Sequence, residues 1–332
     1  MGQTIHKKRI RGLGEEGSVK MGVQRVVAVD WSGDRSAAGQ RRKIWAGVWT
    51  ASAGGRVDGG QVRLESGRTR DELAEWVMEM ARETPRMVVG FDFCFGFPAW
   101  FVRDELGCAD APAFWEIVTE RGEHWLGREC ADTRFWGRPG ASRGKRPAEF
   151  SGERLHRMLR ATDITHKLAA LIPEAERAAL VRGIAPKSVF QIGGAGAVGT
   201  ASLRGIPVVK RLREAGFAVW PFDKPAASRP LIVEMYTRLN TGPVRKSNAE
   251  ARAEYLRRKR AEDAAYAALT PAVLAKARAS EDAFDALVSC MVMTASRSKF
   301  ATLGTPKDSG YIVEGWTWAP DAARGHGKGG MR

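Results

Sequence analysis

Residues 25–30 read Arg-Val-Val-Ala-Val-Asp, four apolar residues in succession that end in an acid. A short apolar run of this kind, followed by Trp-Ser-Gly, predicts a buried β-strand. A carboxylate at the end of a buried strand costs free energy unless it is paired or binds a metal ion. Asp30 is therefore the first candidate for a functional residue, and the rest of the fold is predicted outward from this strand.

The same pattern, an acid in or after an apolar run, recurs along the chain. Two further predicted strands, 87–93 and 230–236, each carry one. A predicted amphipathic helix over 281–297 carries two more, one turn apart on the flank of its apolar stripe. Each acid has a local alternative, such as a turn, a helix cap or a surface ion pair, but their coincidence in one chain favours a shared site. These acids are Asp92, Glu234, Asp282 and Asp285.

The remaining pattern alternates strands and helices and predicts an α/β fold. Apolar and polar residues alternate over 43–50, as in a strand, and a capping box of Thr69 and Glu72 opens a helix. A second capping box, Ser247 with Glu250, opens a charged helix. Further predicted strands cover 62–64 and 217–220.

We expect one folded domain over residues 23–320. Residues of about 98–185 are expected to form an insertion, rich in Trp and Arg, that packs beside the main sheet. The polar, basic and glycine-containing composition of residues 1–22 and 321–332 predicts two disordered tails.

The net charge of the chain favours an anionic partner. There are 53 Lys and Arg against 38 Asp and Glu, a formal charge of +15, and nucleic acid is the first candidate for such a partner. No apolar run is long enough to span a bilayer, and the basic N-terminus lacks the apolar segment of a secretory signal. The four cysteines form no C-x-x-C pair, which disfavours the common zinc spacing. We expect a cytoplasmic protein that does not associate with membranes.

The acids suggest a metal-dependent reaction. Clustered carboxylates favour hard cations with oxygen ligands, so the expected cofactor is Mg²⁺ or Mn²⁺, with two ions bound. Two such ions support phosphodiester hydrolysis without a histidine base. The predicted catalytic residues are Asp30, Asp92, Glu234 and Asp285, and the predicted metal ligands are Asp30, Asp92, Asp282 and Asp285. The candidates for contacting the phosphate of the substrate are Ser32, Lys187 and Arg238.

Several segments resemble a known family. The order of strand meander, helix and strand, with Asp30 on the first strand, looks like the RNase H-like superfamily. Segment 282–287, Asp-Ala-Phe-Asp-Ala-Leu, is similar to the closing helix of Holliday-junction resolvases. More closely, the chain resembles an uncharacterised bacterial family of predicted RNase H-like nucleases, a domain-of-unknown-function family. The segments that carry this resemblance are 29–33, 90–98, 188–193, 220–222, 233–236 and the closing helix.

The resemblance spans roughly residues 25–320 and implies an RNase H-like mixed central sheet flanked by helices. It implies a nuclease in which Asp30, Asp92 and Asp285 bind metal, joined by Glu234 and Asp282. In the RNase H-like pattern a glutamate often comes from the first helix. Here that glutamate would have to be Glu72, Glu75 or Glu79.

Three other functions fit parts of the sequence. Residues 194–199 match G-x-G-x-x-G, but the acid that a dinucleotide site requires at the end of the next strand is missing, so close helix packing is the preferred interpretation. Residues 30–33 suit a phosphate loop of an actin-like ATPase or sugar kinase. The third alternative is a nucleic-acid-binding module without catalysis, in which Trp and Arg of 98–185 contact bases and phosphates, although most of these tryptophans are expected in the core.

Overall fold

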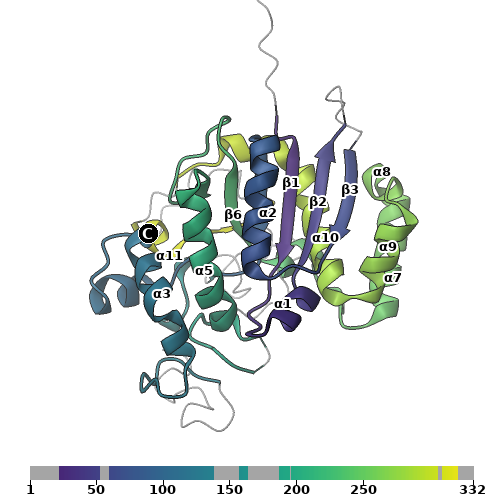
Figure 1. The fold of residues 1–332 in the computed structure, drawn as a ribbon. Coiled ribbons are helices and arrows are strands. Elements are labelled where there is room, and N and C mark those ends of the chain that lie inside the picture. The colour runs from purple at the N-terminus through teal and green to yellow at the C-terminus, as the bar shows by residue number, and fades with distance from the viewer. Residues whose placement is uncertain are drawn as a thin grey trace, which may run out of the picture.

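The computed structural model describes residues 22–52, 60–137, 157–163, 187–194, 196–305 and 309–320. Both predicted tails, apart from Gly22, lie outside these residues, as do positions 138–156 and 164–185 of the predicted insertion. The described chain is an α/β structure in which helices flank a mixed sheet of seven strands, as the sequence predicts (Figure 1).

The sheet consists of β1 (Arg25–Asp30), β2 (Trp45–Ala51), β3 (Gly60–Glu65), β4 (Met87–Phe91), β5 (Ala218–Trp220), β6 (Leu231–Met235) and β7 (Thr317–Trp318). The strand order is β3-β2-β1-β4-β6-β5, and β7 pairs with β6 beyond the end of β5. β1, β2 and β3 form an antiparallel meander, whereas β4, β6 and β5 continue the sheet parallel to β1. β1 therefore joins the antiparallel half to the parallel half.

The helices between and after the strands complete the described fold. The first group is α1 (Ala37–Lys43), α2 (Arg70–Glu83), the π-helix η1 (Trp100–Glu105), α3 (Ala111–Leu126) and α5 (Val198–Glu214). The second group is α6 (Thr237–Thr241), α7 (Ala249–Glu262), α8 (Ala264–Ala267), α9 (Pro271–Ala279), α10 (Glu281–Ala295), the 3-10 helix η4 (Arg297–Thr302) and α11 (Ser309–Glu314).

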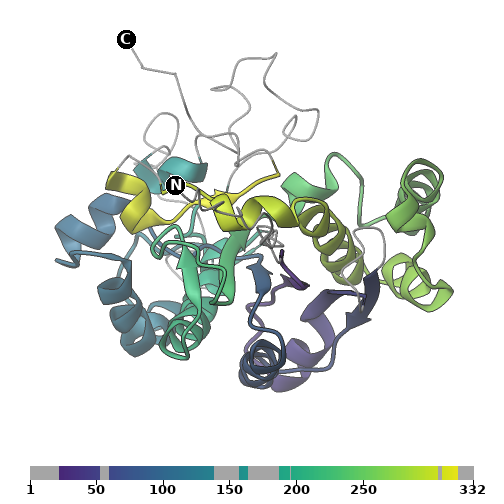
Figure 2. The same cartoon turned by 90° about the horizontal axis from the view of Figure 1, so that it is seen from above.

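Alternate residues of a strand point to opposite faces of the sheet. Different helices pack against these two faces. Val27 and Val29 of β1 belong to an apolar cluster that also contains residues of α2, α3 and α5. Val26 and Ala28 belong to a second cluster, to which α10 contributes. Figure 2 shows α2 and α5 on one side of the strands and α10 on the other.

Two glycines set how closely α10 approaches the sheet. A Cβ atom at Gly47 of β2 would lie 2.6 Å from the carbonyl oxygen of Ala286, and one at Gly90 of β4 would lie 2.7 Å from the Sδ atom of Met293. Both distances are shorter than real Cβ contacts. The lack of a side chain at Gly47 therefore lets the α10 backbone lie directly on β2, and the lack of one at Gly90 makes room for the Met293 side chain.

The two predicted capping boxes have different outcomes. The box at α2 is confirmed, because the Thr69 hydroxyl accepts a hydrogen bond from the Glu72 N–H at 3.3 Å and the Glu72 carboxylate accepts one from the Thr69 N–H at 2.9 Å. The prediction of a second capping box at Ser247 is wrong. Asn248 caps α7, since its side-chain oxygen accepts a hydrogen bond from the Ala251 N–H at 2.8 Å.

The described part of the predicted insertion belongs to the main core. α3 packs on α5 within the helix layer, whereas the sequence predicted an insertion beside the main sheet. The side chains of Trp115, Trp125 and Trp136 are buried, as expected of most tryptophans here. These three rings are therefore not exposed for stacking on bases.

The glycine-rich segment before α5 also packs closely. A Cβ atom at Gly199, in the first turn of α5, would collide with the carbonyl oxygen of Val189. Only glycine fits such an approach of helix to backbone. This contact supports the interpretation of residues 194–199 as a close-packed helix start.

Candidate functional site

Asp30 and Asp92 lie side by side at the ends of neighbouring parallel strands. Val29 of β1 is in register with Phe91 of β4, and the Asp92 N–H continues the ladder by donating to the Val29 carbonyl at 3.1 Å. Two residues at the same level of adjacent strands point to the same face. For Asp30 this is the face of Val26 and Ala28, which α10 covers.

The start of α6 holds the Asp92 side chain. The Thr237 N–H donates to Asp92 Oδ1 at 3.2 Å, and the Thr237 hydroxyl donates to Asp92 Oδ2 at 3.0 Å. Thr237 is itself buried. The carboxylate of Asp92 is therefore oriented by a neighbouring strand–helix junction.

Asp285 reaches the same region from α10. This helix packs on β1 and β2, and the Cys290 thiol lies 3.8 Å from the carbonyl oxygen of Val26. Asp285 is five residues closer to the N-terminus of the helix than Cys290 and is 2% exposed. Because Val26 begins β1 and Asp30 ends it, the antiparallel course of α10 brings Asp285 to the end where Asp30 lies.

Electrostatics show that these acids converge. Burial raises the pKa of Asp30 well above its ordinary value, and Asp285 and Asp92 raise this pKa further. Asp282 adds a smaller contribution in the same direction. Like charges that raise one another's pKa must lie close together in a medium of low dielectric constant. The structure thus brings together Asp30, Asp92 and Asp285, with Asp282 at the margin.

A lysine lies within this group of acids. Lys246, in the loop between α6 and α7, forms an ion pair with Asp285 Oδ2, and its Nζ atom is 3.8 Å from Glu281 Oε1. Burial alone would lower the pKa of Lys246, but Asp285, Asp30 and Asp92 hold it above its ordinary value. Lys246 was not among the residues predicted from the sequence.

Lys246 does not fully compensate Asp285. Burial raises the pKa of Asp285 to about 7 even though Lys246 lowers it, and Asp92 adds to the rise. The second carboxylate oxygen, Oδ1, is buried and has no hydrogen-bond partner. An unpaired buried carboxylate oxygen is costly, so this atom is a candidate to accept a cation or a hydrogen-bond donor.

Asp282 occupies the first turn of α10, two residues after the N-cap Ser280. Burial raises its pKa, Glu281 raises it further, and Lys246 and Lys43 lower it. Negative charge in a first turn is also favourable to the helix dipole. Asp282 therefore combines a structural role with a position near the cluster.

The oxygen ligands of this cluster suit a hard divalent cation such as Mg²⁺ or Mn²⁺. Within the described residues, however, no three His, Cys, Asp or Glu side chains lie close enough together to hold a metal ion as they stand. The ammonium of Lys246 lies against Asp285 instead. The donor chemistry suits a divalent ion, but the carboxylates and Lys246 of the described structure are not arranged to hold one as they stand.

Glu234 lies in a different site. Glu234 of β6 is in register with Phe91, one residue before Asp92, so its side chain points to the face opposite to that of Asp30 and Asp92. It is 1% exposed. The structure does not bring Glu234 together with the three aspartates.

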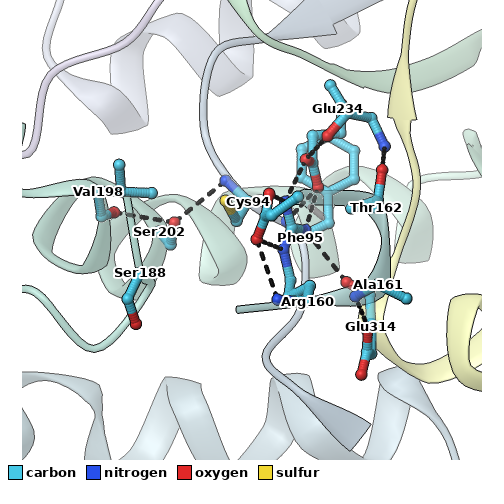
Figure 3. A network of polar contacts seen from close by, with 12 residues as sticks. Cys94, Phe95, Arg160, Ala161, Thr162, Ser188, Val198, Ser202, Glu234 and Glu314 are labelled. Carbon is cyan, nitrogen blue, oxygen red and sulfur yellow. Dashed lines mark hydrogen bonds and ion pairs between the residues drawn. The ribbon is translucent and has the colours of Figure 1, made fainter. Parts of the chain in front are cut away.

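Glu234 is neutralised by a buried arginine, as Figure 3 shows. Arg160 donates to both oxygens of Glu234 at 2.7 Å and to both oxygens of Asp163 at 3.0–3.1 Å. The Thr317 hydroxyl and the Phe95 N–H donate to the same Glu234 carboxylate at 2.6 and 2.9 Å. All its hydrogen-bonding positions are used within the protein, which is a structural arrangement.

Glu314 extends this network to α11. Its carboxylate accepts hydrogen bonds from the N–H groups of Ala99 and Ala161, and its carbonyl oxygen accepts one from Arg160 at 3.1 Å. Burial raises the pKa of Glu314. The network therefore ties residues 157–163 and α11 to β6.

The glutamates of α2 do not join the aspartate cluster. α2 covers the face opposite to α10, and its three candidate glutamates are on its exposed side. Glu72 takes part in the capping box and pairs with Arg41, and Glu75 pairs with Arg211. We therefore expect no metal ligand from this helix.

The three residues predicted to contact phosphate have separate surroundings. Ser32 is buried, and its hydroxyl accepts a hydrogen bond from the Asp34 N–H at 3.2 Å. Arg238 donates to the carbonyl oxygen of Val244 at 2.6 Å, in the loop that carries Lys246. Lys187 is exposed. The structure gives Ser32 and Arg238 contacts within the protein and leaves Lys187 at the surface.

Comparison of the chain with protein-family models, with curated proteins and with solved structures found no match. The site is therefore interpreted from its own geometry. In the part of the chain that the structure describes, no helix combines the length and the apolar character needed to cross a membrane.

Proposed function

We propose that this protein is a metal-dependent nuclease with an RNase H-like fold. Asp30, Asp92 and Asp285 would hold Mg²⁺ or Mn²⁺, with Asp282 nearby. The single observation that carries the proposal is the convergence of these acids from two strand ends and one helix, with the pKa of Asp285 raised to about 7. Strongly shifted carboxylates are typical of functional sites.

The order of elements supports the RNase H-like fold. The antiparallel meander β1-β2-β3 is followed by α2 and then by β4, which pairs parallel to β1. This is the order on which the sequence resemblance rests. In such an arrangement the first strand, its parallel neighbour and a later helix supply the acids.

The chemistry follows from the ligands and the charge. Bound divalent ions would activate water and neutralise charge on the leaving oxygen of a phosphodiester. Thr237 orients Asp92, and burial restricts solvent around Asp285. The net charge of +15 favours a polyanionic substrate. Nucleic acid is the polymer of phosphodiesters that fits this charge.

The core packing disfavours the ATPase alternative for this chain. A second phosphate loop would have to lie near residues 92–96. Phe93 and Phe95 are buried in the main cluster there, so that segment presents no open, glycine-rich backbone to a nucleotide.

The test compares cleavage with and without metal. Purified full-length protein is incubated with a four-way DNA junction, an RNA–DNA hybrid, single-stranded DNA and single-stranded RNA, in Mn²⁺ or in EDTA. We expect cleavage of at least one substrate in Mn²⁺ alone. Asp30→Asn and Asp285→Asn should each lower the rate by about a thousandfold, or about 4 kcal/mol of activation free energy.

Asp71→Asn is the matched control, because it makes the same chemical change at a side chain that is 91% exposed on α2. It should cleave like the parent. Cleavage that survives in Asp30→Asn and Asp285→Asn would falsify the assignment of the site. Binding of nucleic acid without any cleavage would instead favour the non-catalytic alternative.

A further inference from the structure

The position of Lys246 within the aspartate cluster indicates how the site is controlled. We propose that Lys246 is a resident counter-ion, and that a divalent cation binds only by displacing its ammonium group from Asp285. This inference rests on the proposed metal site and adds a competition between the protein's own cation and the metal.

Lys246 lies at the more exposed edge of the aspartate cluster. Its side chain is 26% exposed, whereas the carboxylate that it contacts, Asp285, is 3% exposed. Its charge is attracted by Asp30 and Asp92 as well as by Asp285. The ammonium group therefore forms an ion pair with one carboxylate and attracts two others. The Oε1 atom of Glu281 lies 3.8 Å from it.

The charge balance favours exchange for a divalent ion. Lys246 brings one positive charge, and it leaves Asp285 Oδ1 buried without a partner. A divalent ion brings two charges and accepts several oxygen ligands at once. The ion would thus satisfy an atom that the lysine leaves unpaired.

The loop that carries Lys246 is fixed by its backbone. Arg238 donates to the carbonyl oxygen of Val244 at 2.6 Å, and Arg252 donates to the carbonyl oxygen of Lys246 at 2.5 Å. Arg252 is 5% exposed and also bonds to the carbonyl oxygen of Arg278. Withdrawal of the ammonium therefore needs rotation of the flexible lysine stem alone, without movement of the loop backbone.

The competition predicts a specific effect on metal affinity. A pocket that must first release its own cation binds metal more weakly than the same pocket without that cation. Removing the charge of Lys246 should therefore tighten metal binding. A lysine that helped to bind the metal, or one that was only structural, would not have this effect.

The experiment titrates Mn²⁺ into the metal-free full-length protein and measures bound Mn²⁺ by electron paramagnetic resonance and by calorimetry. Lys246→Gln removes the charge but keeps an amide donor for Asp285. We expect this variant to bind Mn²⁺ about tenfold more tightly than the parent. Lys246→Met, which keeps the length of the side chain, is the second charge-free variant in case the first does not fold.

Two controls separate charge from structure. Lys246→Arg keeps the competing charge and should bind Mn²⁺ with an affinity close to that of the parent. Arg245→Gln removes an exposed charge from the same loop and should also stay close to the parent. Equal or weaker Mn²⁺ binding by the charge-free variants at Lys246 would overturn the inference.

The experiments distinguish a failure of the counter-ion role from a failure of the proposed nuclease function. If the parent binds Mn²⁺ and cleaves nucleic acid, but Lys246→Gln binds no more tightly, the counter-ion role fails and the nuclease remains. If Lys246→Gln binds more tightly and no preparation cleaves any substrate, the counter-ion role holds and the nuclease proposal fails. If neither protein binds Mn²⁺, both fail.

Discussion

The two buried acid clusters of this protein lie on opposite faces of one sheet and are compensated differently. Glu234 accepts hydrogen bonds from Arg160, Thr317 and Phe95, so its charge is fully paired. Asp285 has one lysine partner and an oxygen with none. A fully paired acid acts as a structural tie, whereas an incompletely paired one stores unfavourable free energy that a ligand can release.

The largest expected effect concerns the paired cluster. Arg160→Met leaves Glu234 and Asp163 buried without their counter-ion, and removing one partner of a buried pair costs about 3–5 kcal/mol. The free energy of unfolding, measured with urea, should fall by this amount. Asp30→Asn should not lower it, because the pKa of Asp30 is already raised by burial and by its acidic neighbours. If both variants lost a similar amount of unfolding free energy, the proposed difference between the paired and the incompletely paired cluster would be wrong.

The second effect concerns pH, measured in EDTA. The pKa of Asp285 is about 7 in the folded protein and 3.8 as its ordinary value. Between these values the folded state retains a proton that the unfolded state has lost, so the free energy of unfolding should fall as pH rises from about 4 to about 7.

Asp285→Asn removes this proton and should flatten the dependence, by about 1 kcal/mol or more between pH 5 and pH 8. Urea unfolding at both pH values measures it. Asp71→Asn should keep the slope of the parent. A slope in Asp285→Asn as steep as in the parent would show that another group titrates.

A smaller effect is expected at Thr237. Thr237→Val removes the hydroxyl that donates to Asp92 at 3.0 Å but keeps the backbone N–H bond. A hydrogen bond to a charged group contributes about 1.5–3 kcal/mol at most, so a tenfold weakening of Mn²⁺ binding is expected. Thr237→Ser should bind Mn²⁺ like the parent. Unchanged affinity in the valine variant would mean that Asp92 is not oriented by this hydroxyl.

The smallest effect is expected at Lys187. It is exposed, and single surface charges usually change stability by no more than about 0.5 kcal/mol. Lys187→Ala should leave the unfolding free energy and Mn²⁺ affinity within error of the parent. A marked drop in the affinity of Lys187→Ala for nucleic acid at low salt would support the prediction that Lys187 contacts phosphate.

Local patterns predicted much of the fold. The strands carrying Asp30 and Asp92 and the helix carrying Asp285 are all present, because apolar runs and helical periodicity depend on neighbours in sequence. α3 was missed, although Asp110 caps it and Pro112 stands in its first turn. Its tryptophans were assigned to an insertion beside the main sheet.

What depends on distant residues was not predictable in the same way. Glu234 stands near a strand end like Asp92, yet a shift of one residue in register turns a side chain to the other face. Strand register is set by pairing with β4, which the sequence of β6 does not reveal. Arg160 and Lys246 come from segments without a distinctive pattern, so their roles depend on tertiary packing.

The absence of one methyl group has a consequence for how this protein can vary. At Gly47 a Cβ atom would meet the carbonyl oxygen of Ala286 in α10, so the position of the neighbouring Asp285 depends on a residue that takes no part in any chemistry. An alanine at Gly47 would push α10 away from the strands and move Asp285 away from the other two acids. A substitution in the apolar interior can thus disrupt the aspartate cluster, although every acidic residue stays in the sequence.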